Sequence, residues 1–249
     1  MIDVALTRAE LRSAAVVVVI DVLRATSTIT QALAAGYTKV LCTDSVERAA
    51  VLRAPGRVLA GEQRCAMPAG FDHGNSPLDA RRCAGRELIL ATTNGTPTIV
   101  AAARRGSRVL LACLLNFDAV LKALLETAGV SELDLQIVCS GTDGAPALED
   151  TYLAGLLCAA LPGPRTDAAL IAQAVSLSYP TSFEALTSSA DAGVLRAAGL
   201  ADDIAYCALT SKLDIVPRVL QATRGIAAVI HRTPLAARVA ERDPVDETI

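Results

Sequence analysis

Short aliphatic, β-branched runs alternate along the chain with stretches whose apolar residues recur at helical spacing. The aliphatic runs predict strands at Ile2–Leu6, Val16–Ile20, Lys39–Cys42, Val58–Ala60, Glu87–Ala91, Val109–Ala112 and Leu133–Cys139. The stretches between them predict helices at Thr28–Ala35, Val46–Arg53, Leu78–Ala84, Thr98–Arg105 and Phe117–Ala128. Such alternation is typical of a parallel sheet, and continuously aliphatic strands indicate that both faces of the sheet are covered. The sequence therefore predicts an α/β protein: a three-layer α/β/α fold with a mostly parallel central sheet.

The pattern changes after residues 162–164, which read Pro-Gly-Pro. Ala168–Leu209 is expected to be mainly helical, followed by strands at Ile215–Leu220 and Ile226–Ile230, and a polar, peripheral tail from Arg232. We find no linker long enough to separate independent domains. Residues 1–249 are therefore expected to form a single domain, either of one lobe or of two lobes with a more helical part from about residue 165.

Composition narrows the class of protein. With 52% hydrophobic and 20% charged residues, the chain can bury a large core. Its longest apolar runs, Ala14–Ile20 and Val109–Leu115, are far shorter than the roughly 20 residues that cross a bilayer. The net charge of −3 and the lack of a basic run argue against a nucleic-acid partner. Seven scattered cysteines without a C-x-x-C pair indicate reduced thiols. We expect a cytoplasmic protein with no membrane or nucleic-acid partner.

Polar residues gather at four predicted strand-to-helix junctions, at 20–28, 74–77, 92–97 and 140–146. Ser76 and Thr96 each precede a proline and are expected to be helix N-caps. Helix N-termini attract anions, and the carboxyl ends of parallel strands meet at one edge of a sheet, where ligands bind. Capping alone explains each junction, but the four together predict a phosphate site. The expected substrate contacts are Arg24, Thr26, Ser27, Asn75, Ser76, Thr93, Asn94, Gly95, Thr96, Ser140 and Gly141.

Glu149 is expected to point inward. At about 100° per residue it shares a helical face with Leu153, Leu156 and Ala160, and Asp150 lies at the edge of the same arc. Burial of two carboxylates is costly unless a cation or strong hydrogen-bond donors satisfy them. This placement favours a metal-binding or catalytic role over a structural hydrogen bond.

Two further acids directly follow predicted strands: Asp21, and Glu62 with the donors Gln63 and Arg64 after it. Capping of the next helix is the structural alternative for Asp21. With Asp150, these two acids form an oxygen-rich set suited to Mg²⁺. The predicted metal ligands are Asp21, Glu62 and Asp150, and the predicted catalytic residues are Asp21 and Glu149.

Several common sites are absent. The sequence has no G-x-x-x-x-G-K-[ST] loop, no G-x-G-x-x-G after a strand and no G-x-S-x-G elbow. Its two histidines are His73, in a loop where contact with a substrate is the less favoured interpretation, and His231, near the C-terminus. These absences argue against P-loop NTPases, Rossmann dehydrogenases and Ser-His-Asp hydrolases.

The junctions carry a family resemblance over nearly the whole chain. The segments are I-D-V-L-R-A-T-S-T-I (20–29), G-E (61–62), G-F-D-H-G-N-S-P (70–77), T-T-N-G-T (92–96), S-G-T-D-G-A-P-A-L-E-D-T-Y-L-A-G (140–155) and D-I-V-P (214–217). In order and spacing they resemble the 2-phosphosulfolactate phosphatase family. The chain departs from that family at Gln63, where Arg is usual, and at His73, where an apolar residue is common.

The resemblance implies an α/β/α fold and Mg²⁺-dependent hydrolysis of (R)-2-phospho-3-sulfolactate to 3-sulfolactate and phosphate. In archaeal methanogens the family reaction serves coenzyme M biosynthesis. We expect a small phosphorylated acid as substrate; whether it carries a sulfonate is left open. A homodimer is an option, because an Ala- and Leu-rich surface helix can pair with its copy.

Two mechanisms are compatible with the residues. In the first, Asp21 or Glu149 orients or deprotonates a water molecule beside Mg²⁺. In the second, Asp21 is itself the nucleophile, although Leu23 stands where haloacid-dehalogenase-type phosphatases have a second Asp. The alternative function is a non-catalytic sensor of a small phosphorylated acid, which needs no inward-facing acids beside its phosphate site.

Overall fold

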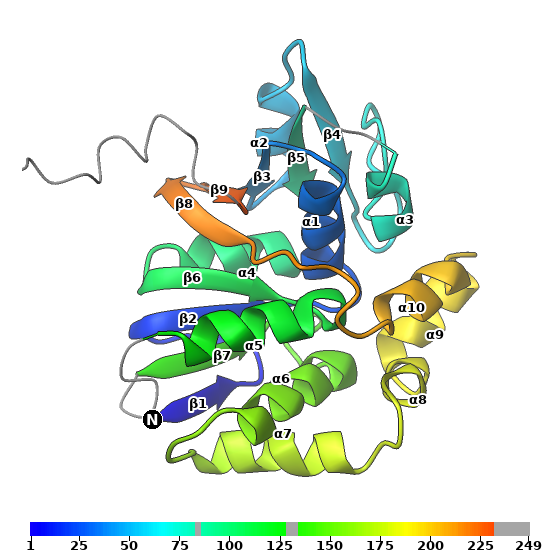
Figure 1. Cartoon of the computed structure of the whole chain (residues 1–249). Coiled ribbons are helices and arrows are strands. Elements are labelled where there is room, and N and C mark those ends of the chain that lie inside the picture. The colour runs from blue at the N-terminus through cyan, green and yellow to red at the C-terminus, as the bar shows by residue number, and fades with distance from the viewer. Residues whose placement is uncertain (83–85, 128–133, 232–249) are drawn as a thin grey trace, which may run out of the picture.

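The structure, a computed structural model, describes residues 1–82, 86–127 and 134–231 and contains a nine-stranded sheet (Figure 1). The strands are β1 (Ile2–Ala5), β2 (Ala14–Ile20), β3 (Lys39–Thr43), β4 (Arg57–Gly61), β5 (Glu87–Ala91), β6 (Gly106–Ala112), β7 (Leu135–Cys139), β8 (Arg218–Thr223) and β9 (Ile226–Ile230). The α-helices are α1 (Ala25–Ala34), α2 (Val46–Val51), α3 (Pro77–Ala80), α4 (Gly95–Ala102), α5 (Phe117–Leu125), α6 (Leu148–Ala160), α7 (Asp167–Leu177), α8 (Ser182–Thr187), α9 (Ala190–Ala197) and α10 (Ala201–Cys207).

The sheet consists of two parallel halves joined by the hairpin β8–β9. Its order is β1-β7-β2-β6-β8-β9-β3-β5-β4. The pairs within β1-β7-β2-β6 and within β3-β5-β4 are parallel, whereas β6–β8, β8–β9 and β9–β3 are antiparallel. Three successive antiparallel pairs reverse the direction, so the two halves run in opposite senses along the sheet. The predicted mostly parallel sheet is confirmed, and the hairpin is the part that departs from it.

Strand β2 shows how the aliphatic runs produce three layers. Val16, Val18 and Ile20 pack into the hydrophobic cluster that contains residues of α5 and α6. Val17 and Val19, which point to the opposite face, pack into the cluster that contains residues of α1 and α4. A continuous apolar run is therefore buried on both sides, which confirms the predicted α/β/α arrangement.

Most predicted strands are present within one or two residues; the strand expected at Val109–Ala112 begins three residues earlier, at Gly106, and the strand expected at Ile215–Leu220 begins only at Arg218. Pro217 precedes it and has no N–H to donate to a sheet ladder. The helix expected from Thr28 begins at Ala25, because the Asp21 carboxylate accepts the Ala25 N–H at 2.7 Å. The tail from Arg232 lies outside the described residues.

The helix expected at Leu78–Ala84 is shorter in the structure. Helix α3 ends at Ala80, and the last two residues of the predicted helix lie outside the described ranges. All six cysteines in the described ranges are free, and five are buried as expected for core thiols. Cys65 is the exception, since it is only half-buried.

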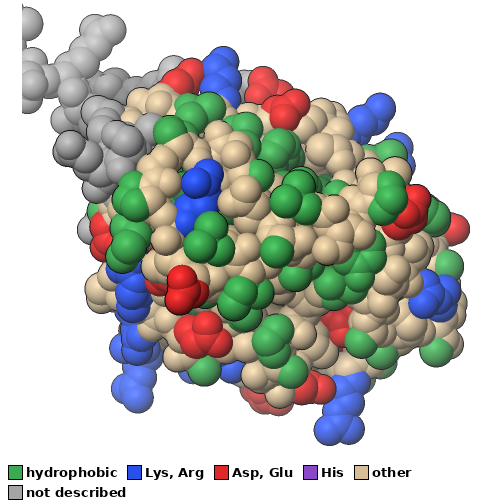
Figure 2. Space-filling model, turned by 90° about the horizontal axis from the view of Figure 1, so that it is seen from below, with side chains coloured by type: hydrophobic (Ala, Val, Ile, Leu, Met, Phe, Trp, Pro, Cys, Tyr) green, Lys and Arg blue, Asp and Glu red, His purple; other side chains and the backbone are tan. Residues whose placement is uncertain are grey.

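The helical part expected from about residue 165 corresponds to α7–α10, after which the chain returns to the sheet as β8 and β9. Helix α7 lies at the bottom of Figure 1, and the view from below shows hydrophobic side chains on that face (Figure 2). Leu170, Ile171 and Leu177 of α7 are exposed. Among the residues that the structure describes, no helix has both the length and the apolar character needed to cross a membrane.

Candidate active site

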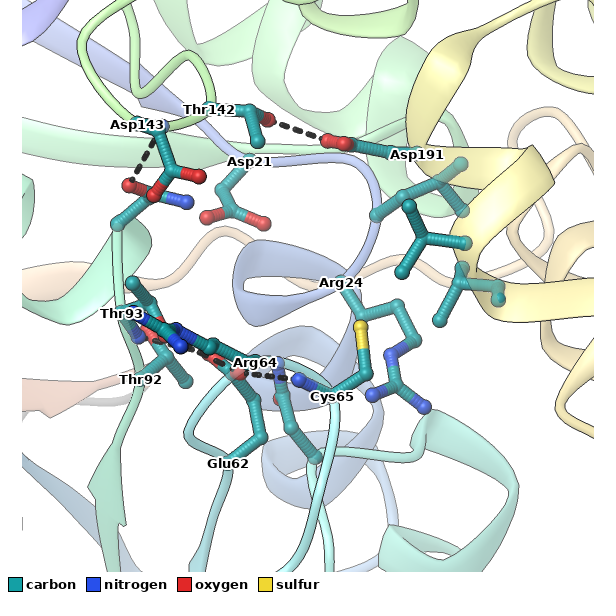
Figure 3. A pocket seen from close by; sticks show the side chains of 15 residues that line it. Asp21, Arg24, Glu62, Arg64, Cys65, Thr92, Thr93, Thr142, Asp143 and Asp191 are labelled. Atoms are coloured by element: carbon teal, nitrogen blue, oxygen red, sulfur yellow. Dashed lines mark hydrogen bonds between the residues drawn. The ribbon is translucent and has the colours of Figure 1, made fainter. Parts of the chain in front are cut away.

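A cavity of about 170 Å³ lies where carboxyl ends of strands from the two half-sheets meet (Figure 3). Asp21 follows β2 of one half, and Glu62 and Thr92 follow β4 and β5 of the other. We expected the junctions along one edge of a single parallel sheet; instead, junctions from two half-sheets that run in opposite senses line the same cavity. The lining residues are Asp21, Leu23, Arg24, Glu62, Arg64, Cys65, Asn75, Thr92, Thr93, Asn94, Thr142, Asp143, Asp191, Val194 and Leu195.

Asp21 caps a helix and also faces the cavity. Its Oδ1 accepts the Ala25 N–H, while its Oδ2 lies beside the first residue of α4. A Cβ added to Gly95 would lie 2.4 Å from this Oδ2, so only glycine allows the α4 N-terminus to come so close. Burial, reinforced by the charges of Glu62 and Asp191 and partly offset by the Ala25 N–H bond, raises the pKa of Asp21 to about 7.

A second, smaller cavity of about 20 Å³ adjoins Asp21 and is lined by the carboxylates of Asp21, Glu149, Asp150 and Asp191. Glu149 is only 2% exposed, and its Oε2 has no hydrogen-bond partner among the described residues. Burial and the charges of Asp150 and Asp191 raise the pKa of Glu149 to about 9. A buried, unpartnered carboxylate oxygen indicates that a proton or a cation belongs at this position.

The inward direction predicted for Glu149 is confirmed, but the apolar arc drawn to support it is partly wrong. Leu153 is fully buried, whereas Leu156 is half-buried and Ala160 is exposed. Helix α6 lies against α7, so Ala154 and Gly155, which the arc left out, are also buried. Asp150 is buried as well, and its two oxygens accept backbone N–H groups at 2.8 and 3.2 Å.

The predicted metal trio of Asp21, Glu62 and Asp150 is not assembled as a cluster. Glu62 lies on another wall, where Oε1 accepts the Thr93 N–H at 2.7 Å and Oε2 accepts the Cys65 N–H at 2.9 Å. Within the ranges that the structure describes, no three His, Cys, Asp or Glu side chains form a group that could hold a metal ion. Glu62 therefore bonds to residues of its own wall, and its role as a metal ligand with Asp21 and Asp150 stays a prediction.

The acids of the smaller cavity nevertheless suit Mg²⁺. They offer hard carboxylate oxygens, one of which, Glu149 Oε2, is buried without a partner. Proteins commonly hold Mg²⁺ through one or two carboxylates, with water and substrate phosphate completing the six ligands. One or two of the four acids at this cavity, Asp21, Glu149, Asp150 and Asp191, would supply such ligands, and the predicted ligand set stays a prediction.

Six of the predicted substrate contacts lie at the cavities or directly beside them. Arg24, Asn75, Thr93 and Asn94 line the larger cavity, and Asn94 and Gly141 line the smaller one. Gly95 starts the helix beside Asp21. Figure 3 shows Asp21, Thr142, Asp143 and Asp191 grouped on one side of the pocket, with Arg24, Cys65 and Glu62 toward the other.

The other five predicted contacts support the site from behind. The Thr26 and Ser27 hydroxyls donate to the carbonyls of Asp21 and Val22. The Ser140 hydroxyl is buried without a partner in the described chain. None of these side chains lines either cavity. Short polar side chains at a junction bond readily to nearby backbone, which the sequence pattern does not separate from ligand binding.

The two proposed N-caps have different outcomes. Ser76 is the N-cap of α3, but its hydroxyl donates to Asp203 and accepts no N–H from the helix. Thr96 is not an N-cap, because α4 begins at Gly95 after Asn94. The Thr96 hydroxyl instead accepts the Thr92 N–H at 2.8 Å.

Sequence reasoning missed the contribution of helix α9. Asp191 in its first turn accepts a hydrogen bond from the Thr142 hydroxyl, and Val194 and Leu195 line the larger cavity. Asp191 follows the N-cap Ser189 by two residues, where an acid is ordinarily explained by the helix dipole. Only the tertiary fold brings this acid to the junctions.

Comparison with known proteins places these features in a family. The sequence model of the family described as 2-phosphosulpholactate phosphatase matches residues 3–222. The chain is 40% identical over 223 residues to a probable 2-phosphosulfolactate phosphatase of Thermus thermophilus, covering 87% of this chain and 92% of the relative. Proteins with the same description from Deinococcus radiodurans (37% over 213 residues, covering 82% and 88%) and Thermotoga maritima (34% over 226 residues, covering 88% and 96%) are also similar.

These matches extend from β1 into β8 and include every strand end that contributes to the two cavities. The chain therefore belongs to the 2-phosphosulpholactate phosphatase family, a family of phosphoric monoester hydrolases.

Proposed function

We propose that this protein is a Mg²⁺-dependent phosphatase that hydrolyses (R)-2-phospho-3-sulfolactate to 3-sulfolactate and phosphate. The main support for the proposal is that acidic and basic side chains line the same cavity. A cluster of carboxylates lies beside Asp21, and Arg24 and Arg64 are also in the wall. The names of the similar proteins support this substrate.

The arginines and the start of α4 suit a substrate with several acidic groups. Arg24 and Arg64 offer planar guanidinium donors, which bind phosphate, sulfonate and carboxylate groups well. The α4 N-terminus, at Gly95, adds a helix end that favours anions beside Asp21. A three-carbon acid bearing phosphate and sulfonate can therefore contact positive groups on more than one side.

The acids of the smaller cavity, Asp21, Glu149, Asp150 and Asp191, would hold Mg²⁺. When bound, Mg²⁺ supplies positive charge that attracts phosphate oxygens and favours ionisation of a water molecule. Asp21 lines both cavities, so its carboxylate lies between the proposed metal site and the substrate cavity, where it can orient a water molecule or accept a proton from it. Phosphoryl transfer depends mainly on positioning and charge stabilisation, which these residues can provide.

The experiment measures phosphate released from (R)-2-phospho-3-sulfolactate by the purified protein with Mg²⁺ and with EDTA. We expect release only with Mg²⁺, and a loss of about 10²–10⁴-fold in Asp21→Asn. Asp118→Asn, an exposed acid on α5, is the matched control and should leave the rate unchanged. Binding of the compound without phosphate release would support the sensor alternative instead.

The nucleophilic role of Asp21 is tested separately by rapid-quench trapping with labelled substrate. Attack by water leaves no label on the protein. A stoichiometric, acid-stable and base-labile phosphoprotein would assign the nucleophile to Asp21 and contradict its role as a base.

The proposal includes a cytoplasmic location. Free, mostly buried thiols at the described cysteines support it.

The proposal also includes a part in coenzyme M biosynthesis and a homodimer. The part in coenzyme M biosynthesis follows only if the substrate carries the sulfonate, so a panel of phosphorylated three-carbon acids with and without that group tests it. The homodimer stays a prediction, checked by light scattering of the purified protein.

A further inference from the structure

Arg24 in the wall of the larger cavity forms a buried ion pair with a residue of the helical segment. Its Nη1 lies 2.6 Å from Oδ2 of Asp203 in α10, and the two side chains are only 3% and 2% exposed. The residues are 179 positions apart in the chain. The pair therefore connects the β2–α1 junction to a helix that contributes no lining residue of its own to this cavity.

The second oxygen of Asp203 is also engaged. Its Oδ1 accepts a hydrogen bond of 2.7 Å from the Ser76 hydroxyl. Ser76 follows Asn75, which lines the cavity and whose Oδ1 is buried without a partner in the described chain. One carboxylate thus holds together an arginine and a loop that both reach the same cavity.

Helix α10 is itself fixed against the sheet-bound helix α1. Tyr206 in α10 donates a hydrogen bond to Gln31 in α1, and the Arg81 guanidinium lies 5.4 Å from the centre of the Tyr206 ring. Asp203 is therefore presented by an anchored element. A buried ion pair contributes little net stability compared with apolar packing. The place of this pair at the cavity wall therefore indicates that Asp203 controls the conformation of Arg24.

We propose that Asp203 is a positioning residue that holds the Arg24 guanidinium at the cavity wall, where Arg24 binds an acidic group of the substrate, and that Ser76 in turn holds Asp203. This inference rests on the proposed function. A flexible arginine without Asp203 would have to be ordered when the substrate binds, so its loss should weaken binding more than it slows the chemical step.

The test compares the kinetics of Asp203→Asn, Arg24→Ala and the double variant, with Asp202→Asn as matched control because Asp202 is the exposed neighbour on the same helix. Asp203→Asn should raise KM for (R)-2-phospho-3-sulfolactate about tenfold with little change in kcat, while Asp202→Asn leaves both unchanged. In the Arg24→Ala background, Asp203→Asn should raise KM no further. An unchanged KM in Asp203→Asn, or effects that multiply in the double variant, would overturn the proposal.

Ser76→Ala covers the case in which Asp203→Asn does not fold, as judged by thermal melting. It removes one of the two hydrogen bonds to Asp203 and should raise KM about two- to fivefold at unchanged kcat. An unchanged KM in a folded Ser76→Ala protein contradicts the role of Ser76 and, with it, the proposed chain of contacts.

A wild-type protein that releases no phosphate would refute the proposed function but leave this inference open to measurement. Calorimetry with inorganic phosphate then replaces kinetics. Weaker phosphate binding in Asp203→Asn than in Asp202→Asn supports the positioning role, and equal affinities overturn it.

Discussion

At the scale of single residues, Asp21 combines two features that the sequence presented as alternatives, a helix cap and a place in the wall of the cavity. Its Oδ1 accepts the Ala25 N–H at the start of α1, its Oδ2 lies beside Gly95, and the residue lines both cavities. The cap fixes the orientation of the carboxylate, so a structural contact and a functional position reinforce each other. The inward direction of Glu149 was predicted correctly, although only Leu153 of the supporting arc is fully buried. Glu62 has the same sequence context as Asp21 but bonds to Thr93 and Cys65.

Gly95→Ala tests the close approach of α4 to Asp21. The added Cβ would lie 2.4 Å from both Asp21 Oδ2 and Ala25 Cβ, so the helix or the carboxylate must move. Because a displacement of about 1 Å can cost about 100-fold, we expect kcat/KM to fall by that order. Gly74→Ala is the control, since its Cβ would meet nothing within 4 Å. Equal activity of the two variants would contradict the required proximity.

At the scale of elements, the strands were the most predictable part. A short, continuous aliphatic run is typical of a strand in a sheet that is covered on both faces. Helix starts were less predictable. Helix α1 begins three residues before the expected Thr28, since Asp21, a residue outside the helix, satisfies its first N–H. Helix α6 illustrates a second limit, because packing against α7 buries residues that lie outside the predicted arc.

Gly155→Ala tests that packing. A Cβ at this position would lie 2.0 Å from the Ala172 carbonyl oxygen and 2.8 Å from Ser176 Cβ, so α6 and α7 must separate. We expect the free energy of unfolding to fall by about 1–3 kcal/mol in denaturant titration. Gly193→Ala in α9, whose nearest neighbour would be a flexible arginine at 4.0 Å, should be neutral or stabilising by up to about 1 kcal/mol. Similar losses in both variants would refute the packing argument.

At the scale of the whole molecule, the proposed Mg²⁺ site predicts a link between metal binding and the stability of the fold. Burial raises the pKa of Asp21 to about 7 and that of Glu149 to about 9, both above the values of the unfolded chain. The metal-free folded state therefore binds more protons than the unfolded state, and its stability falls as pH rises from about 4 through these values. A cation that binds the ionised carboxylates should oppose this loss.

Thermal unfolding in EDTA and in Mg²⁺ at pH 6 and pH 8.5 measures this linkage without reference to activity. We expect Tm in EDTA to be lower at pH 8.5, and the increase on adding Mg²⁺ to be larger there than at pH 6. Glu149→Gln should reduce the pH dependence seen in EDTA. An equal Mg²⁺ effect at both pH values would show that these carboxylates do not hold the cation.

Local patterns in the sequence predicted the three-layer class, the strands and the junctions that carry polar residues, because hydrophobic periodicity is a local property of the chain. Family membership follows from the same junctions. Which acids share a cavity depends instead on the tertiary packing. The hairpin β8–β9 reverses the direction between the half-sheets, and α9 and α10 bring Asp191 and Asp203 to the site from more than 100 residues beyond Asp21 and Ser76. Such contacts depend on how distant elements pack, and no local pattern in the sequence encodes them.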